Sequence, residues 1–441
     1  MGRFSLIVGI AVLIILLLPG TVRAAPRLQD IKGEKLVIVI DPGHGGENRG
    51  TIENSHEEKQ MTMTTALAMY EELVQYEDVE VYLTHTEDID MTLKERAAFA
   101  KSVDADFLFS IHYNASANHE LFGSEVWVSA FPPYNSYGYQ FGCEFLTDMR
   151  EFGLLVRGVK TRLGDKGLDY YGIIRESVAL DIPAVIIEHC HVDEARDAVY
   201  CENDEQLRQF GKMDAAAVAR YFGLKSSSLG VDYSGYQLAD ADASSVVPVT
   251  VVDATEPEIC RVEFLDADYE NYMLKVQVTA MDSDSPLLYY SYSTDRGISY
   301  SAREVWPESD TLTGSYADTF TLEIPVTPGT WPRVIVRAYN IYDLYTESDC
   351  LTSPEAFAAP QVQEVDGRDI EVVPAEDLSL ESQPEEAQKN ARFAVLFRSC
   401  LLAAGILLLA ILIVQGILFR RRRKNRIQRR NEPGSSRNQP R

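Results

Sequence analysis

The chain has 441 residues, which suggests two or three domains if an ordinary domain has roughly 100 to 200 residues. Its net charge is -26, and because Arg420 to Arg441 holds ten Lys/Arg against one acid, the rest stands at -35. A nucleic-acid-binding protein needs a basic surface to neutralise phosphates, so the acidic body excludes that class of partner.

The first 24 residues are expected to be a signal peptide. Arg3 precedes an apolar core from Leu6 to Leu18, and Val22 and Ala24 are small residues at the positions that a signal peptidase reads. We expect cleavage after Ala24. An uncleaved N-terminal anchor is the alternative, but the apolar core is short for a membrane span.

Residues 35–225 alternate between strand and helix patterns. Helical spacing of apolar residues covers Met61 to Val74, and Thr92 with Glu95 forms a capping box that opens a second helix. Apolar runs predict strands at Leu36 to Ile40, Val79 to Leu83, Asp106 to Ile111, Ser124 to Ser129 and Ala184 to Ile187. The alternation predicts an α/β domain, with a mostly parallel twisted sheet and helices on both faces.

The next part of the chain has a different period. Residues 226–248 are rich in Ser, Asp and Gly and are expected to be a linker. Between 249 and 351 apolar and polar residues alternate, for example over Tyr272 to Ala280 and Val334 to Ala338, which predicts a small antiparallel β-sandwich. Its closing VRAYNIYD resembles the last strands of bacterial immunoglobulin-like or fibronectin-like modules.

Six cysteines in a chain expected outside the membrane invite disulfides. Cys260 and Cys350 bracket the predicted sandwich and are the favoured pair. Cys143, Cys190 and Cys201 leave an odd number in the first domain.

The C-terminal part is expected to anchor the chain. Residues 352–397 form an acidic stalk without a fold of its own, and residues 399–419 are long and apolar enough for a transmembrane helix. The basic segment 420–441 follows directly, and because Lys and Arg concentrate on the cytoplasmic side of a span, it should be a cytoplasmic tail. We therefore expect a single-pass protein of a bacterial cell membrane with an extracellular N-terminal ectodomain.

Ionisable side chains interrupt the first domain where its apolar strands end. His44 follows VIVIDPG, His112 follows FLFSI and Glu188 follows AVII. Ligands of open α/β sheets bind outside the carboxyl ends of the strands, so these three groups are expected to converge. A buried structural histidine is the alternative explanation for each residue taken alone.

These residue types suggest metal-assisted hydrolysis. Glu58 is a further candidate, in the loop that DPGHGG begins, and two imidazoles with one carboxylate are ligands that a catalytic Zn²⁺ uses. A second carboxylate nearby would take a proton from water and pass it to a leaving amine. Cys190, two residues after Glu188, is a weaker candidate nucleophile.

Five segments follow one another within residues 35–225: DPGHGG, EKQMTMTTALAMYEEL, VYLTHTED, SIHYNAS and IPAVIIEHC. Taken together they resemble the zinc-dependent N-acetylmuramoyl-L-alanine amidases, a family of bacterial cell-wall hydrolases. The resemblance implies that His44, Glu58 and His112 bind zinc and that Glu188 is the catalytic glutamate. It is the resemblance that selects Glu58 over Glu57 and His56.

The chain departs from the family pattern in three places. His85 stands where the family usually has arginine, which puts a structural ion pair in doubt. His189 and His191 follow Glu188 and could crowd the site, with His191 as a rival ligand. The aromatic, Gly-rich segment Phe131 to Gly142 is expected to be a loop, either at the cleft or elsewhere on the surface.

The sequence therefore predicts a membrane-anchored zinc amidase that cleaves the bond between N-acetylmuramic acid and L-alanine in peptidoglycan. A zinc peptidase acting within the stem peptide is one alternative. A non-catalytic surface module that binds the cell wall is another.

Overall fold

The structure is a computed structural model that describes residues 35–53, 56–238, 253–307, 309, 311–312 and 317–360. The expected signal peptide at 1–24, the stalk beyond residue 360, the span at 399–419 and the tail at 420–441 lie outside these residues. Over the part that is described, no helix combines the length and hydropathy of a membrane span.

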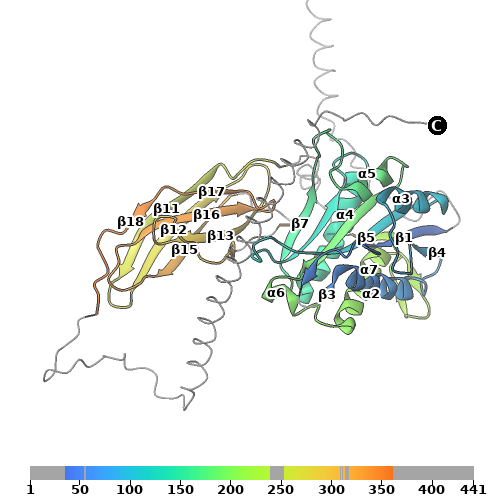
Figure 1. Ribbon diagram of the computed structural model, residues 1–441, viewed down its shortest axis with the longest axis horizontal. Coiled ribbons are helices and arrows are strands. Elements are labelled where there is room, and N and C mark those ends of the chain that lie inside the picture. Colours follow the sequence, from blue (N-terminus) through green and yellow to red (C-terminus); the bar gives the residue numbers. More distant parts are fainter. Residues whose placement is uncertain are drawn as a thin grey trace, which may run out of the picture. The chain divides into compact units, whose positions relative to one another are not determined.

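The first module is built on a six-stranded sheet (Figure 1). From edge to edge the strands are β4 (Val79–Leu83), β1 (Leu36–Pro42), β5 (Phe107–Asn114), β8 (Ala184–His191), β6 (Ser124–Val128) and β7 (Val156–Thr161). All neighbours are parallel except β6 and β8, which run antiparallel. The prediction of a mostly parallel sheet is confirmed, and one antiparallel pair makes it a mixed sheet.

Helices cover both faces of this sheet, as predicted. On one face lie α2 (Glu58–Leu73), α4 (Tyr134–Phe152) and α7 (Asp204–Phe222), and on the other lie α3 (Leu93–Ser102) and α5 (Gly172–Val178). Side chains alternate along each strand, so Ile38 and Ile40 enter the core under α2 while Val39 enters the opposite core. A single turn, α6 (Ala195–Ala198), follows β8.

The segment Phe131 to Gly142, expected to be a loop, is mostly helix, because α4 begins at Tyr134. Its glycines allow the helix to approach the sheet. A Cβ at Gly138 would lie 2.6 Å from Val128 Cγ1, which is closer than side chains can pack. The glycines that indicated a loop are therefore packing residues.

Two short hairpins complete the module. β2 (Ile52–Glu53) pairs with β3 (His56–Glu57) just before α2, and β9 (Lys225–Ser226) pairs with β10 (Val231–Asp232). The second hairpin falls where the linker was expected to begin, at residue 226. Leu229, Val231 and Tyr233 pack against the core under α7, so this apolar stretch belongs to the α/β module.

The second module, within residues 253–360, has two antiparallel sheets. One contains β11 (Ile259–Asp268), β12 (Met273–Met281) and β15 (Ala317–Pro325). The other contains β14 (Glu304–Val305), β13 (Leu287–Ser293), β16 (Arg333–Asn340) and β17 (Tyr345–Glu347), with β18 (Leu351–Thr352) beside β16. Both sheets contribute to one core, which also contains Trp306 and Phe357. Since Phe357 is buried, the module extends beyond the expected boundary at residue 351.

The predicted disulfide between Cys260 and Cys350 is wrong, because both cysteines are free. Cys260 is buried on β11, and its Sγ lies 3.3 Å from the carbonyl oxygen of Val336. Cys350 is exposed, one residue before β18. Cys260 and Cys350 stand near the two ends of the second module in the sequence, but the fold does not join them in a disulfide.

Candidate active site

His44, Glu58 and His112 meet at the carboxyl ends of β1 and β5. His44 Nε2 lies 3.0 Å from Glu58 Oε2, and His112 Nδ1 lies 3.1 Å from Glu58 Oε1. One ligand atom from each residue falls within 4.8 Å of the others. The two imidazoles are 19% and 20% exposed against 5% for the carboxylate, so the set opens to solvent on its histidine side. The structure thus brings together the three residues that the resemblance implied as metal ligands.

Donor type and geometry fit a zinc ion. Two imidazole nitrogens and one carboxylate leave a fourth position open, as catalytic zinc sites do. Asn48 Oδ1 lies 3.0 Å from His44 Nδ1, and this contact orients the ring so that Nε2 faces Glu58. Outer contacts of this kind fix the tautomer of a metal-binding histidine. His44, Glu58 and His112 are thus the residues that would hold the metal.

Arg96 of α3 supports the loop that carries His44, a role that the sequence did not indicate. Its buried guanidinium donates 2.7 Å to Asp41 Oδ1 and also donates to the carbonyl oxygens of Pro42 and His44. His44 itself has a φ of 67°, a left-handed conformation that costs free energy for a residue with a Cβ. Arg96 thus holds His44 in that conformation. Its ion pair with Asp41 is linked to His85 through the Thr84 hydroxyl, which lies 2.7 Å from Asp41 Oδ1 and 3.1 Å from His85 Nδ1.

Two glycines make room for the ligand side chains. A Cβ at Gly43 would lie 2.4 Å from the His112 ring, and a Cβ at Gly50 would lie 2.5 Å from Glu58 Oε2. Gly50 also has a φ of 67°, which favours glycine. The glycines of this loop therefore permit close approach of its backbone to the ligand set.

Glu58 is ionised by its surroundings. Burial alone would raise its pKa, but hydrogen bonds from His112 and His44 more than offset that effect, so the pKa is lowered from its usual value. The backbone amides of Tyr113 and Thr51 donate to the two carboxylate oxygens at 3.1 and 2.9 Å. A carboxylate that stays charged is suited to binding a cation.

Glu188 lies on β8 directly beside His112 of β5. It is half-buried, and its Oε2 atom is buried without a hydrogen-bond partner among the described residues. Burial raises the pKa of this carboxyl, as does repulsion from Glu58 and Glu125, while Lys160 acts in the opposite direction. The fold does not use this oxygen, which leaves it available for proton transfer.

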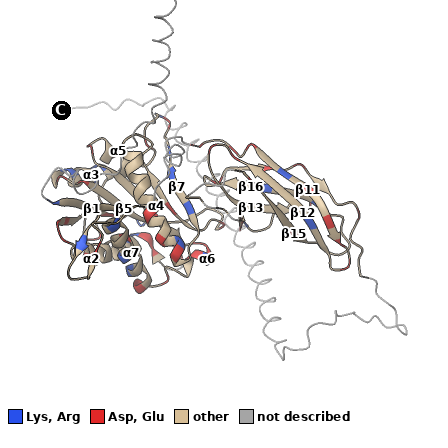
Figure 2. Cartoon of the chain, turned by 180° about the vertical axis from the view of Figure 1, so that it is seen from behind, with Lys and Arg blue, Asp and Glu red and all other residues tan. Residues whose placement is uncertain are grey.

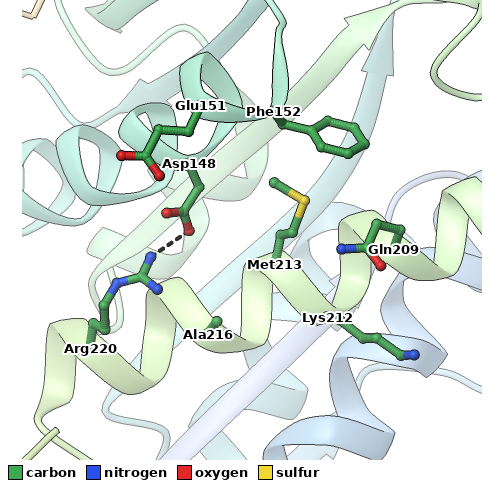
Figure 3. Close-up of a pocket in the computed structure, with 8 residues that line it drawn as sticks. All are labelled: Asp148, Glu151, Phe152, Gln209, Lys212, Met213, Ala216 and Arg220. Atoms are coloured by element: carbon green, nitrogen blue, oxygen red, sulfur yellow. Dashed lines mark hydrogen bonds and ion pairs between the residues drawn. The ribbon is translucent and has the colours of Figure 1, made fainter.

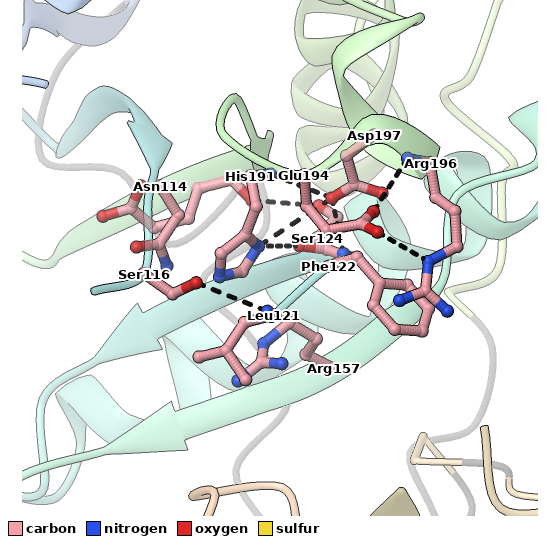
Figure 4. Close-up of polar contacts among 12 residues, drawn as sticks. Asn114, Ser116, Leu121, Phe122, Ser124, Arg157, His191, Glu194, Arg196 and Asp197 are labelled. Atoms are coloured by element: carbon pink, nitrogen blue, oxygen red, sulfur yellow. Dashed lines mark hydrogen bonds and ion pairs between the residues drawn. The ribbon is translucent and has the colours of Figure 1, made fainter. Parts of the chain in front are cut away.

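The two histidines that follow Glu188 have structural partners. His189 Nε2 lies 3.0 Å from Asp214 Oδ1 of α7, and the ring stacks on Tyr113. His191 is buried, with Nδ1 3.1 Å from the carbonyl oxygen of Gly123, and Figure 4 shows it beside Asp197. Burial lowers the pKa of His191 to about 4. Neither ring belongs to the group that could hold a metal.

Cys190 does not share the face of Glu188. The register of β5 and β8 shifts between His112 and Asn114, and Cys190 is buried in the core under α2 and α7. Burial raises its thiol pKa well above the usual value, which disfavours a nucleophilic thiolate.

A surface pocket of about 420 Å³ lies away from these residues, between α4 and α7 (Figure 3). Its lining includes Asp148 and Arg220, which form an ion pair, together with Phe152 and Met213. Its lining contains none of His44, Glu58, His112 and Glu188.

A histidine–glutamate–histidine metal site with a free carboxylate beside it defines a candidate metal-dependent hydrolase. Residues 38–220 match the family model described as N-acetylmuramoyl-L-alanine amidase. The chain is 31% identical over 194 residues to the N-acetylmuramoyl-L-alanine amidase CwlM of Bacillus licheniformis, covering 43% of this chain and 70% of that protein. It is 30% identical over 192 residues to the sporulation-specific N-acetylmuramoyl-L-alanine amidase of Bacillus subtilis (strain 168), and this match also covers 43% of this chain and 70% of that protein.

Among solved structures, the catalytic domain of CwlV, an N-acetylmuramoyl-L-alanine amidase from Bacillus (Paenibacillus) polymyxa var. colistinus, shares 26% identity with this chain. That match has a TM-score of 0.38 and covers 43% of this chain and 99% of that one. By its sequence relatives the chain belongs to the N-acetylmuramoyl-L-alanine amidase family. It is an N-acetylmuramoyl-L-alanine amidase, an enzyme that acts on peptidoglycan.

Proposed function

We propose that this amidase is zinc-dependent and cleaves the amide between the lactyl group of N-acetylmuramic acid and L-alanine. The observation that carries the proposal is the convergence of His44, Glu58 and His112 beside Glu188, whose Oε2 atom has no hydrogen-bond partner in the described part of the chain. Bound zinc supplies Lewis-acid chemistry, which polarises an amide carbonyl and makes water acidic enough to be deprotonated near neutral pH.

The chain's own residues supply the proton transfers. Glu188 accepts a proton from the attacking water and donates it to the departing amine of L-alanine, so one group is first a base and then an acid. This role is supported by its partly buried position and by its Oε2 atom, which no described residue hydrogen-bonds. Arg96 and Asn48 orient His44, and the backbone amides of Thr51 and Tyr113 orient Glu58.

Replacement of Glu188 tests this assignment. Glu188→Gln keeps the size of the side chain but removes the group that takes the proton, and the release of stem peptides should fall by at least 10²-fold. Zinc content should remain that of the parent. Glu205→Gln, an exposed substitution on α7, is the matched control and should retain activity. Near-normal turnover by Glu188→Gln with zinc retained would remove Glu188 from the mechanism.

Product analysis separates amidase from peptidase action. Mass spectrometry of digested sacculi should detect new L-alanine amino termini and muramic acid without a stem peptide. Removal of metal with a chelator should abolish both products, and added Zn²⁺ should restore them. Cleavage within the stem peptide would support the peptidase alternative instead.

We further propose that the enzyme is held on the outer side of a bacterial membrane. The support is the order of sequence features: a signal peptide at 1–24, an apolar segment at 399–419 and a basic tail at 420–441. Protease added to intact protoplasts should digest both modules and spare an epitope placed after residue 441. Digestion of that epitope, or recovery of the chain in the soluble fraction, would contradict the proposed orientation.

A further inference from the structure

The second module, within residues 253–360 (the β module), covers one edge of the six-stranded sheet of the first module (the amidase module). Strand β7 is the last strand of that sheet, yet all six of its residues are buried. Side chains of the β module satisfy backbone groups at both of its ends: Thr311 Oγ1 donates 2.8 Å to the Val156 carbonyl oxygen, and the Thr161 amide donates 3.1 Å to the Tyr342 hydroxyl. Both modules belong to one compact unit, which ends at Pro360. The β module therefore protects an edge that would otherwise present unpaired polar groups.

An apolar contact reinforces this interface. Phe122 of the amidase module shares a buried cluster with Leu288, Tyr289, Tyr339 and Ile341 of the β module. The guanidinium of Arg196 lies 3.5 Å from the centre of the Phe122 ring. Figure 4 shows these two side chains next to each other. The interface thus combines apolar burial with hydrogen bonds to the sheet edge.

Arg157 of β7 joins the two modules. Figure 2 shows the basic residues of this strand in blue. The buried guanidinium donates from Nε to Glu125 Oε2 at 2.7 Å, from Nη1 to the Tyr289 hydroxyl at 2.8 Å and from Nη2 to Asp343 Oδ2 at 2.6 Å. Tyr289 in turn donates to the Phe122 carbonyl oxygen. Two of the three partners of Arg157 thus come from the β module.

Glu125 connects this arginine to the proposed active site. It is 2% exposed, it accepts from Lys160 Nζ at 2.6 Å and from Asn114 Nδ2 at 2.9 Å, and it lies directly opposite Glu188 in the antiparallel pair of β6 and β8. A continuous series of contacts therefore runs from Asp343 and Tyr289, through Arg157 and Glu125, to the strand position of Glu188.

We propose that Asp343 and Tyr289 of the β module are positioning residues for the amidase, acting through Arg157 and Glu125 on Glu188. The inference rests on the proposed role of Glu188. If Asp343 is neutralised, a buried guanidinium loses a charged partner and must rearrange, and Glu125 is its nearest remaining carboxylate. A displacement of about 1 Å in a catalytic group can reduce turnover by as much as 10²-fold.

The test compares Asp343→Asn and Tyr289→Phe in the full-length chain. We expect kcat on peptidoglycan to fall at least fivefold in each variant, with KM within twofold and zinc content equal to that of the parent. Asp343→Glu, which keeps the charge, should recover most of the activity. Asp349→Asn, an exposed substitution in the same module, is the matched control and should leave kcat unchanged.

Three results would overturn the inference. The first is a kcat within twofold of the parent in both variants, and the second is a loss of activity that Asp343→Glu does not recover. The third is loss of zinc in both variants, because the network would then support the metal ligands instead of Glu188. A parallel measurement on Glu188→Gln separates the two proposals: an active Glu188→Gln enzyme contradicts the proposed function, whereas an inactive one beside a normal Asp343→Asn enzyme contradicts only the positioning role.

Discussion

Glu125 and Glu188 face each other as registered neighbours on the antiparallel strands β6 and β8. Like charges directly opposite each other in a sheet are destabilising, so the two carboxyls need different environments. Lys160 and Arg157 hold the pKa of Glu125 below its usual value, although burial alone would raise it. Glu188 has no cation in hydrogen-bond contact among the described residues, and its pKa is raised. One carboxyl is thus fixed as an anion and the other is free to exchange a proton.

Glu125→Gln should destabilise the amidase module strongly. The substitution leaves Arg157 and Lys160, each about 1% exposed, without their shared carboxylate. Removing one partner of a buried ion pair typically costs about 3–5 kcal/mol of unfolding free energy. Urea unfolding followed by circular dichroism should show a loss of that size.

A surface pair provides the control for Glu125→Gln. Glu80 lies 3.3 Å from Lys35 with both side chains well exposed, and Glu80→Gln should cost less than about 1 kcal/mol. Equal losses in the two variants would show that the buried network contributes no more than a surface pair.

Gly50→Ala should weaken zinc binding at least 10-fold. The added Cβ would lie 2.5 Å from Glu58 Oε2 and 2.7 Å from His44 Cδ2, so two ligands must move. Changes next to metal ligands typically reduce affinity by about 10- to 100-fold. Competition with a chromogenic chelator measures the affinity.

Gly167→Ala is the matched control for this variant. Gly167 has the same φ of 67°, but a Cβ there would meet nothing within 4 Å. Both variants should lose about 1 kcal/mol of stability from the left-handed backbone conformation. Only Gly50→Ala should lose zinc, and parallel losses would indicate a general effect of backbone strain.

The sequence was sufficient to predict His44, His112 and Glu188, because each follows an apolar run and parallel strands deliver their carboxyl ends to one edge. Glu58 needed the resemblance to a family, since nothing local distinguishes it from Glu57. Arg96 was not found because its partners are mostly backbone carbonyls of a distant loop, which leave no pattern in the sequence.

The missed elements share a physical cause. Strand β7 reads VRGVKT, and its two basic residues conceal the pattern of a buried strand. Both Arg157 and Lys160 pair with Glu125, which lies 32 residues before Arg157, and Arg157 also pairs with Asp343 of the other module. The contact between the modules likewise depends on residues far apart in the chain. Local periodicity cannot report pairings of this kind.

Asp197→Asn should change the pH dependence of stability. Burial raises the pKa of Asp197 to about 6, although the amides of His191 and Gly123 donate to its Oδ2 at 2.9 and 2.6 Å. The folded state therefore binds a proton between about pH 6 and the ordinary aspartate pKa near 3.9, where the unfolded state does not. By linkage this group stabilises the parent as the pH falls through that window.

The asparagine variant lacks this gain. Between pH 7 and pH 4.5 the unfolding free energy of the parent should rise by about 2 kcal/mol relative to that of Asp197→Asn. The size follows because pH 4.5 lies about 1.5 units below the raised pKa of Asp197. Urea unfolding at the two pH values measures the difference. A difference between parent and variant that is independent of pH, or that shrinks as the pH falls, would contradict the raised pKa.

Alkylation should distinguish the two cysteines of the β module. Cys350 is exposed and should react with iodoacetamide in the native protein within minutes. Cys260 is buried, and burial raises its pKa to about 12, so its thiolate is scarce and inaccessible. Peptide mass spectrometry should find label on Cys350 before denaturation and on both residues in urea. If both cysteines remain unlabelled in urea until a reductant is added, they are joined by a disulfide, and this result would contradict the free thiols seen in the structure.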